Sequence, residues 1–139
     1  LVRREVITHA LERGLYPLLH GDIVPSDEGY VVVSGDDIAV ELARFYKPSA
    51  VIFLMNVDGI YTASPGSPNA EKIRRLKSNV YLEGTAGVDV TGGIRKKVEA
   101  GLAIAALGTP VFYCSISDRE SLEIIARGGA PENCTSVEP

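Results

Sequence analysis

The sequence predicts an α/β fold in which a mostly parallel sheet is flanked by helices on both faces, as an αβα sandwich. Short apolar runs rich in β-branched residues alternate along the chain with segments whose apolar residues recur at helical spacing. The run AVIFLMNV at 50–57 is almost continuously apolar, which is typical of a strand covered on both faces. The 139 residues, 45% of them hydrophobic, are enough to bury one core. We therefore expect a single domain over residues 1–139, with 50–57 as its central strand.

In the first half of the chain, the expected elements follow from apolar spacing and stop signals. Apolar residues along one stripe, ahead of Gly14, predict a helix over 2–13. The runs LYPLLHG at 15–21 and YVVVSGDD at 30–37 are too short for helices and predict buried strands. Helical spacing resumes in DDIAVELARFY, which predicts a helix over 36–46.

The second half is expected to continue this alternation. Prolines, a glycine and small polar side chains at 61–70 predict a surface loop. The segments that follow are, in order, short edge strands at 71–76 and 79–84, a helix at 94–108 ended by Gly108, a strand at 110–116, a capped helix at 118–129, and a tail at 130–139 that closes with an edge strand or frays.

Composition and charge exclude several classes of partner. The net charge is −4, and the basic residues are spread along the chain rather than massed, so we expect no nucleic-acid or anionic-membrane binding. No apolar run approaches the roughly 20 residues of a membrane span, and the first residues lack a signal-peptide core. We expect a cytoplasmic protein.

The two cysteines are expected to be unpaired. Cys114 lies in the apolar run TPVFYCSI, where a small buried hydrophobe is the usual interpretation and a disulfide or a metal ligand the rarer one. Neither Cys114 nor Cys134 belongs to a cluster with zinc-site spacing. We therefore expect a reducing compartment and no metal site built from the protein's own residues.

Four short segments combine glycine with small polar or acidic residues where strands are expected to end or helices to begin. They are HGD at 20–22, SGDD at 34–37, NVDG at 56–59 and DVTGG at 89–93. In a parallel sheet, ligands bind at the carboxyl ends of the strands, where free N–H groups of the following helices point outward. The four segments together indicate a phosphate or nucleotide site.

The last of these segments has two interpretations. Gly92 and Gly93 allow the backbone to approach an anion, and Lys97, one turn further on, adds a positive charge for a phosphoryl group. Alternatively, the glycines form a bend and Arg95, Lys96 and Lys97 are merely solvated. A short glycine motif that matches neither the Walker A pattern nor GxGxxG leaves both interpretations open.

Four segments of the chain, in this order, resemble the C-terminal half of the amino acid kinase family. They are LLHGDIV, VVVSGDDIAVELA, VIFLMNVDGIYTASP and VDVTGGIRKKVEAGLAIAALG. Within the family the likeness is greatest to archaeal isopentenyl phosphate kinases. Four ordered motifs are far more specific than any one of them. The resemblance implies an amino acid kinase-like fold and ATP-dependent phosphoryl transfer to a small phosphate or carboxylate acceptor. The acceptor that it favours most is isopentenyl phosphate. It also implies Mg²⁺, carried by the nucleotide.

The resemblance also implies roles for individual residues. Asp36 and Lys97 are the expected catalytic residues; for both, the alternative is structural, Asp36 or Asp37 as a helix cap and Lys97 as a surface lysine. The expected nucleotide-binding residues are Asn56, Asp58, Gly59, Tyr61, Gly92, Gly93 and Lys97. The residues expected on the acceptor side, where the implication is weaker, are His20, Gly21, Asp22, Ser34 and Gly35.

The sequence departs from the family pattern at three places. Met55 and Asn56 stand where relatives carry threonine and aspartate, Ile94 stands for a methionine, and Cys134 stands for the glycine of a closing Gly-Thr pair. The first departure favours a second function, that of a non-catalytic nucleotide-binding or regulatory module of the same fold. A third alternative, a structural remnant, is disfavoured by the joint presence of Asp36, Gly92, Gly93 and Lys97.

The family's N-terminal half, with its glycine-rich phosphate loop and most of the acceptor pocket, has no counterpart in this sequence. Whether the chain acts as an enzyme alone is therefore left open. A half sheet exposes an unpaired edge or an uncovered face, so we expect a homodimer or a complex with a chain that supplies the N-terminal half.

Overall fold

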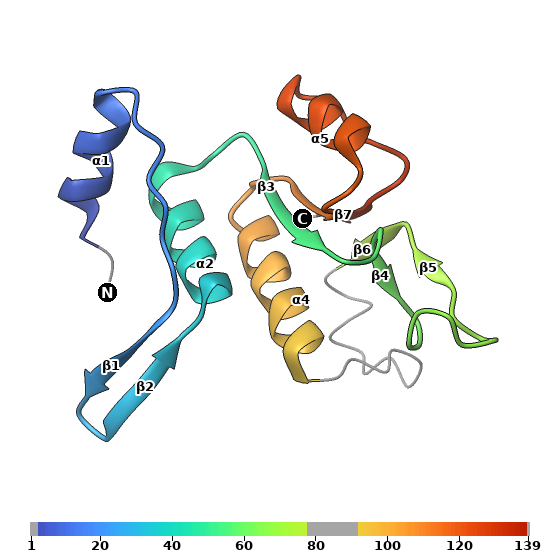
Figure 1. The fold of residues 1–139 in the computed structure, drawn as a ribbon, viewed down its shortest axis with the longest axis horizontal. Helices are drawn as coiled ribbons and strands as arrows, with labels where there is room; N and C mark the ends of the chain where they lie inside the picture. Colours follow the sequence, from blue (N-terminus) through green and yellow to red (C-terminus); the bar gives the residue numbers. More distant parts are fainter. Residues whose placement is uncertain (1–2, 78–91, 139) are drawn as a thin grey trace.

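The computed structural model describes residues 3–77 and 92–138 (Figure 1). The elements are α1 (Arg4–Glu12), β1 (Asp22–Ser26), β2 (Gly29–Val33), α2 (Gly35–Tyr46), β3 (Val51–Met55), β4 (Ile60–Tyr61), β5 (Lys72–Ile73), β6 (Arg75–Lys77), α4 (Gly92–Ala105), β7 (Val111–Ser115), α5 (Arg119–Ala126) and β8 (Thr135–Glu138). Within these residues, no helix is both long enough and apolar enough to cross a membrane.

A mixed four-stranded sheet with helices on both faces forms the centre of the molecule. Its order is β3-β7-β8-β6, and β3 with β7 and β6 with β8 are parallel, while β7 and β8 are antiparallel. Tyr113 on β7 packs with α2 and α4, and its neighbours Phe112 and Cys114 pack with α5. This alternation along β7 is what a strand buried on both faces requires. The predicted α/β class is confirmed.

The positions of β3 and β8 in this sheet correct two expectations. Among the described strands β3 lies at the edge of the sheet, not at its centre, and Leu54 is half exposed. The tail forms β8, which lies inside the sheet between β7 and β6. An apolar run indicates burial but does not indicate the order of strands, because that order depends on pairings between distant segments.

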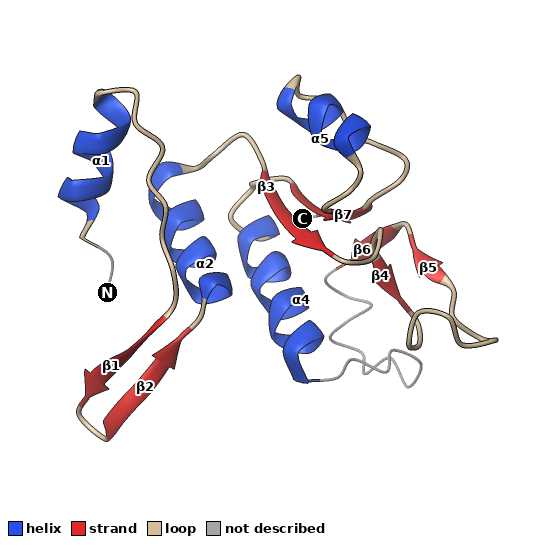
Figure 2. Ribbon diagram, in the orientation of Figure 1, coloured by secondary structure: helices blue, strands red, loops and turns tan. Residues whose placement is uncertain are grey.

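The segment before α2 also differs from expectation. Residues 15–21 form no strand, and Leu18 is 97% exposed. β2 does form, but it pairs antiparallel with β1 as a separate hairpin, and Val32 is 75% exposed (Figure 2). Pro25 in β1 is tolerated because a two-stranded sheet consists of edge strands only. Both expectations of buried strands in a parallel sheet are wrong.

The helices expected in the second half are present. α4 buries Val98 and Ala105, partly buries Ile94 and Leu102, and ends ahead of Gly108, whose φ is +84°. α5 is capped by Asp118, which accepts a hydrogen bond from the backbone N–H of Ser121. β5 and β6 occupy the segment 71–76 and extend to Lys77, whereas the strand expected at 79–84 lies outside the described residues.

A disulfide joins Cys114 on β7 to Cys134, the residue before β8. Both sulfur-bearing side chains are buried beside Phe112 and Ile125. The burial predicted for Cys114 is confirmed, but the expectation of two unpaired cysteines is wrong. The pairing of β7 with β8 brings the two residues together, and their separation of 20 positions carries no signal of that pairing.

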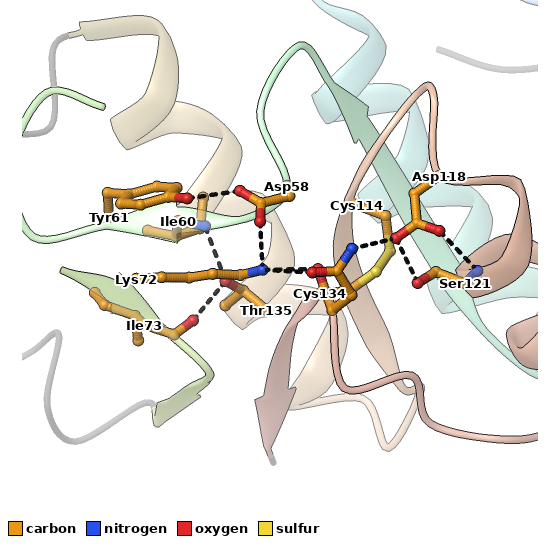
Figure 3. A network of polar contacts seen from close by, with 11 residues as sticks. Asp58, Ile60, Tyr61, Lys72, Ile73, Cys114, Asp118, Ser121, Cys134 and Thr135 are labelled. Atoms are coloured by element: carbon orange, nitrogen blue, oxygen red, sulfur yellow. Dashed lines mark hydrogen bonds and ion pairs between the residues drawn. A yellow bond between two sulfur atoms is a disulfide. The ribbon is translucent and has the colours of Figure 1, made fainter. Parts of the chain in front are cut away.

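A polar network ties the turn after β3 to β5, β8 and α5 (Figure 3). Asp58 accepts hydrogen bonds from Lys72 Nζ at 2.8 Å and from the Tyr61 hydroxyl at 2.6 Å. Lys72 Nζ also donates to the carbonyl of Asn133 at 2.7 Å, and Asn133 Nδ2 donates to Asp118 at 2.7 Å. These bonds hold the turn at Asp58 against the end of the sheet.

The buried hydroxyl of Thr135 completes this connection. It accepts a hydrogen bond from the backbone N–H of Ile60 at 2.8 Å and donates one to the carbonyl of Ile73 at 2.5 Å. A buried hydroxyl with both roles satisfied avoids the free-energy penalty of an unpaired polar group. Thr135 therefore joins β4, β5 and β8 at one point.

The disulfide is expected to contribute about 3 kcal/mol to the free energy of unfolding, because a cross-link of this separation restricts the unfolded chain. Chemical denaturation with and without a dithiol reductant measures this difference. A Cys114→Ala/Cys134→Ala double variant serves as the control, since reductant should leave its unfolding curve unchanged. Identical curves for the unsubstituted chain in both conditions would contradict the prediction.

The polar network predicts an acid-sensitive contribution to stability. The hydrogen bond from Lys72, then that from Tyr61, lowers the pKa of Asp58. A carboxyl group with a lowered pKa in the folded state stabilises that state above its unfolded pKa of about 4, and this contribution is lost as pH falls through the folded pKa.

We therefore expect the free energy of unfolding to fall more steeply below about pH 4 for the unsubstituted chain than for Asp58→Asn. Denaturant titrations at a series of pH values measure both slopes. Asp27→Asn, in the exposed turn between β1 and β2, is the matched control for removal of a carboxylate. Parallel slopes for the unsubstituted chain and Asp58→Asn would show that the network contributes nothing.

Candidate functional site

An ion pair between Asp36 and Lys97 joins the starts of α2 and α4. Lys97 Nζ lies 2.6 Å from Asp36 Oδ1, and the two side chains are 26% and 21% exposed. The helices lie side by side and begin at the same end of the molecule (Figure 1). A partly desolvated, charge-assisted hydrogen bond of this length is among the stronger polar contacts in proteins. The structure thus brings together the two residues expected to be catalytic.

The capping of α2 leaves Asp36 free for this contact. Ser34 is the N-cap: its hydroxyl accepts from the backbone N–H of Asp37 at 3.2 Å, and Asp37 Oδ2 accepts from the backbone N–H of Ser34 at 2.7 Å. Hydrogen bonds from the Ser34 hydroxyl and backbone lower the pKa of Asp37. The cap is therefore Ser34, with Asp37 as its reciprocal partner, and a capping role for Asp36 is wrong.

The glycine pair lies inside the first turn of α4 rather than in a loop before it. α4 begins at Gly92, and a Cβ added at Gly93 would meet no described atom within 4 Å. The first N–H groups of a helix have no acceptor within the helix, and the helix dipole favours an anion there. Residues 89–91 of the DVTGG segment lie outside the described residues. Contact of Gly92 and Gly93 with phosphate stays a prediction.

Four of the expected nucleotide-binding residues follow the end of β3: Asn56, Asp58, Gly59 and Tyr61. Asn56 is exposed directly after the strand, while Asp58 and Tyr61 are hydrogen-bonded to each other within the polar network. Gly59 is buried, and a Cβ there would lie 2.5 Å from Thr135 Oγ1. Packing therefore requires glycine at this position. Nucleotide contacts of these four residues stay a prediction.

Two of the residues expected on the acceptor side, His20 and Asp22, line a cavity of about 340 Å³ between α1, the hairpin and α2. His20 Nδ1 lies 2.8 Å from the carbonyl of Gly21, and Asp22 Oδ1 accepts from the backbone N–H of Ile23 at 2.8 Å. A Cβ at Gly21 would overlap the carbonyl of Val33. The lining of the cavity consists of Arg3, His20 and Asp22 with Val6, Ile7, Leu19, Val24, Val33 and Ile38.

Ser34 and Gly35 do not line this cavity; Ser34 caps α2, and Gly35 has open space around it. The HGD segment leads into β1, which begins at Asp22, instead of ending a strand, and SGDD follows the hairpin instead of a strand of the main sheet. The expectation that HGD and SGDD end strands of the main sheet is therefore wrong. The contact of Asp36 with Lys97 nevertheless joins the second segment to α4.

Two aromatic residues beneath Lys97 were missed. Lys97 Nζ lies 5.0 Å from the centroid of the Phe53 ring, and the Phe53 ring stacks on Tyr113. The hydroxyl of Tyr113 donates to the backbone carbonyl of Lys97 at 2.9 Å. A glycine four residues after Lys97, at Gly101 in the middle of α4, was the available signal, because it permits close approach of another side chain.

Within residues 3–77 and 92–138, no three His, Cys, Asp or Glu side chains are grouped so that they could hold a metal ion.

Comparison with known proteins gives consistent relatives. Isopentenyl phosphate kinase of Thermoplasma acidophilum is 39% identical over 92 residues, 65% of this chain and 37% of that protein. That of Methanocaldococcus jannaschii is 37% identical over 94 residues, 67% of this chain and 36% of that protein. The crystal structure of the T. acidophilum enzyme in its product complex superposes with a TM-score of 0.76 at 25% identity, covering 96% of this chain and 52% of that chain.

This chain thus spans about a third of the length of these curated relatives and about half of the solved one. Residues 1–115, most of the 139, match the model of the amino acid kinase family. The sheet with helices on both faces and the likeness of the whole chain to a solved kinase agree with that match. The chain belongs to the amino acid kinase family.

Proposed function

We propose that this chain supplies the nucleotide-binding part of an ATP-dependent phosphotransferase. The observation that carries the proposal is the ion pair of Asp36 with Lys97 where α2 and α4 begin. Phosphoryl transfer depends mainly on positioning and on stabilising the charge of the transferred group. Lys97 would contact the phosphates, and Asp36 would hold its ammonium group in place until they arrive.

Further features of α4 support an anion at the same place. The N–H groups of its first turn have no acceptor within the helix, and no described atom lies within 4 Å of a Cβ at Gly93, so phosphate oxygens could approach the backbone there. Mg²⁺ bound to the nucleotide phosphates would neutralise part of their charge. The ammonium group of Lys97 would then be in place before the nucleotide binds and would move little when it does.

We propose isopentenyl phosphate as the acceptor. One of its phosphate oxygens would attack the γ-phosphorus of ATP, forming a new P–O bond, while the bond to the β,γ-bridging oxygen breaks, giving isopentenyl diphosphate and ADP. The cavity bordered by His20 and Asp22 supports this choice, because its lining is mainly aliphatic and polar groups lie at only a few positions.

A second candidate function is a nucleotide-binding module without catalysis. The observation that favours it is Asn56, an amide directly after β3 where the family resemblance implies a carboxylate, with Met55 buried before it. Such a module would bind Mg-ATP without transferring its phosphoryl group. Turnover with isopentenyl phosphate distinguishes the two candidates.

We further propose that a second polypeptide surface covers the hairpin, as a homodimer or as a complex with a chain that supplies the other half of the fold. Exposed apolar side chains on the hairpin support this, among them Ile23, Tyr30 and Val32. The coverage of half of the solved relative is consistent with it. The catalytic assembly would then include groups from outside this chain.

Lys97→Ala is expected to weaken Mg-ATP binding about tenfold to a hundredfold, because a charge-assisted hydrogen bond contributes about 1.5–3 kcal/mol. Calorimetric titration of the full chain measures the affinity. Lys96→Ala, on the exposed neighbour, is the matched control and should bind as the unsubstituted chain does. No binding at millimolar nucleotide, or equal binding by the Lys97→Ala variant, would overturn the proposal.

Val24→Phe is expected to weaken binding of isopentenyl phosphate at least about tenfold, because the larger ring fills the cavity and excludes CH₂ groups worth about 0.8 kcal/mol each. Mg-ATP binding should be unchanged. The control is Leu107→Phe, which places the same ring at an exposed position after α4, away from both the cavity and the hairpin. Equal affinities of both variants for isopentenyl phosphate would mean that this cavity does not hold the acceptor.

A further inference from the structure

We propose that Tyr113 is a positioning residue for Lys97. The stacked rings of Tyr113 and Phe53 pack beneath the Lys97 side chain and hold it in contact with Asp36. The consequence for phosphate binding rests on the proposed function. The placement of Lys97 itself does not, and it is tested separately.

Tyr113 contacts Lys97 through its hydroxyl group. The side chain is fully buried, and its hydroxyl donates to the Lys97 carbonyl at 2.9 Å and lies 3.5 Å from that of Val98. The bond reaches from β7 to the turn of α4 that carries the expected catalytic lysine. It therefore fixes the distance between this turn and the sheet.

Phe53 supports the other end of the lysine. The Phe53 and Tyr113 rings stack with centroids 5.2 Å apart and an interplanar angle of 15°. Lys97 Nζ lies 5.0 Å from the centroid of Phe53, within the range of a cation–π contact. The same stack thus contacts the backbone of Lys97 through Tyr113 and its ammonium group through Phe53.

Gly101 makes the close approach possible. A Cβ at this position would overlap the hydroxyl of Tyr113 and lie 2.8 Å from its ring carbon Cζ. Glycine inside a helix is less favourable than alanine, so its presence here accompanies a contact that a side chain would prevent. If the side chain at position 113 only filled the core, neither a hydroxyl group there nor a glycine at position 101 would be needed.

Competitive lysine acylation of the ligand-free chain tests the placement of Lys97. A limiting amount of acylating reagent is applied, and modification of Lys97 is compared by mass spectrometry with that of Lys96 as internal reference. In Tyr113→Phe, loss of one hydrogen bond should raise the relative rate at Lys97 about threefold to fivefold. Tyr46→Phe is the matched control, since it removes a tyrosine hydroxyl that donates to the Arg4 carbonyl, away from the ion pair.

Phe53→Leu provides a second variant, which keeps an apolar side chain but removes the stack and the ring beneath Nζ. It should raise the relative rate at Lys97 by a similar factor, again without change in the Tyr46→Phe control. An unchanged relative rate in both Tyr113→Phe and Phe53→Leu overturns the inference, whatever the chain binds.

Nucleotide titrations then test the consequence. Tyr113→Phe should weaken Mg-ATP binding about threefold to fivefold and leave adenosine binding unchanged, since only the phosphates reach Lys97. In the Lys97→Ala background the same substitution should have no further effect, because residues that act through one another are not additive. Equal weakening for Mg-ATP and adenosine would mean that Tyr113 is structural and would overturn the inference.

The two proposals fail in different ways. If the unsubstituted chain does not bind Mg-ATP, yet acylation of Lys97 rises in Tyr113→Phe, the proposed function is wrong and the positioning of Lys97 stands. If Mg-ATP binds through Lys97, yet Tyr113→Phe changes neither acylation nor affinity, the proposed function stands and the inference is wrong.

Discussion

The antiparallel pairing of β7 with β8 determines the geometry of the whole C-terminal half. Because Tyr113 stands opposite Thr135, the cysteines that neighbour them meet on the α5 side of the sheet. The same register places the hydroxyl of Thr135 between Ile60 and Ile73. On the face of the sheet opposite the disulfide, the same register leaves Tyr113 directed at α4. One strand pairing thus accounts for the disulfide, for the hydrogen bonds of Thr135 that hold the segment after β3, and for the position of the Tyr113 ring beneath Lys97.

The carboxylates near the site differ in how many hydrogen-bond and ion-pair partners they have within the protein. Asp37 is occupied by the helix cap, and Asp58 accepts from both Lys72 and Tyr61. Asp36 contacts Lys97 of α4 in a partly exposed position. Groups with several internal partners stabilise the fold, whereas a single partly hydrated pair can be rearranged by an incoming anion at lower free-energy cost. This difference is why we propose Asp36, rather than Asp37, as the carboxylate that positions Lys97.

Helical periodicity was sufficient to locate α2, α4 and α5, because each has a continuous apolar stripe. The contact of Asp36 with Lys97 required the family resemblance, since residues 61 positions apart carry no mutual signal in one sequence. The disulfide and the interior place of β8 depend on strand register, which composition does not encode. The hairpin was missed because its valines resemble those of a buried strand, although Gly29 after Asp27 and Glu28 marks a turn.

The contact between Gly101 and Tyr113 constrains how this protein can change over time. A side chain at position 101 is incompatible with tyrosine at 113, so a substitution at 101 is tolerated only after the aromatic ring has been replaced by something smaller. The reverse order passes through a chain whose helix is pushed away from its sheet. A change that adds a side chain at 101 therefore has to be preceded or accompanied by a smaller residue at 113.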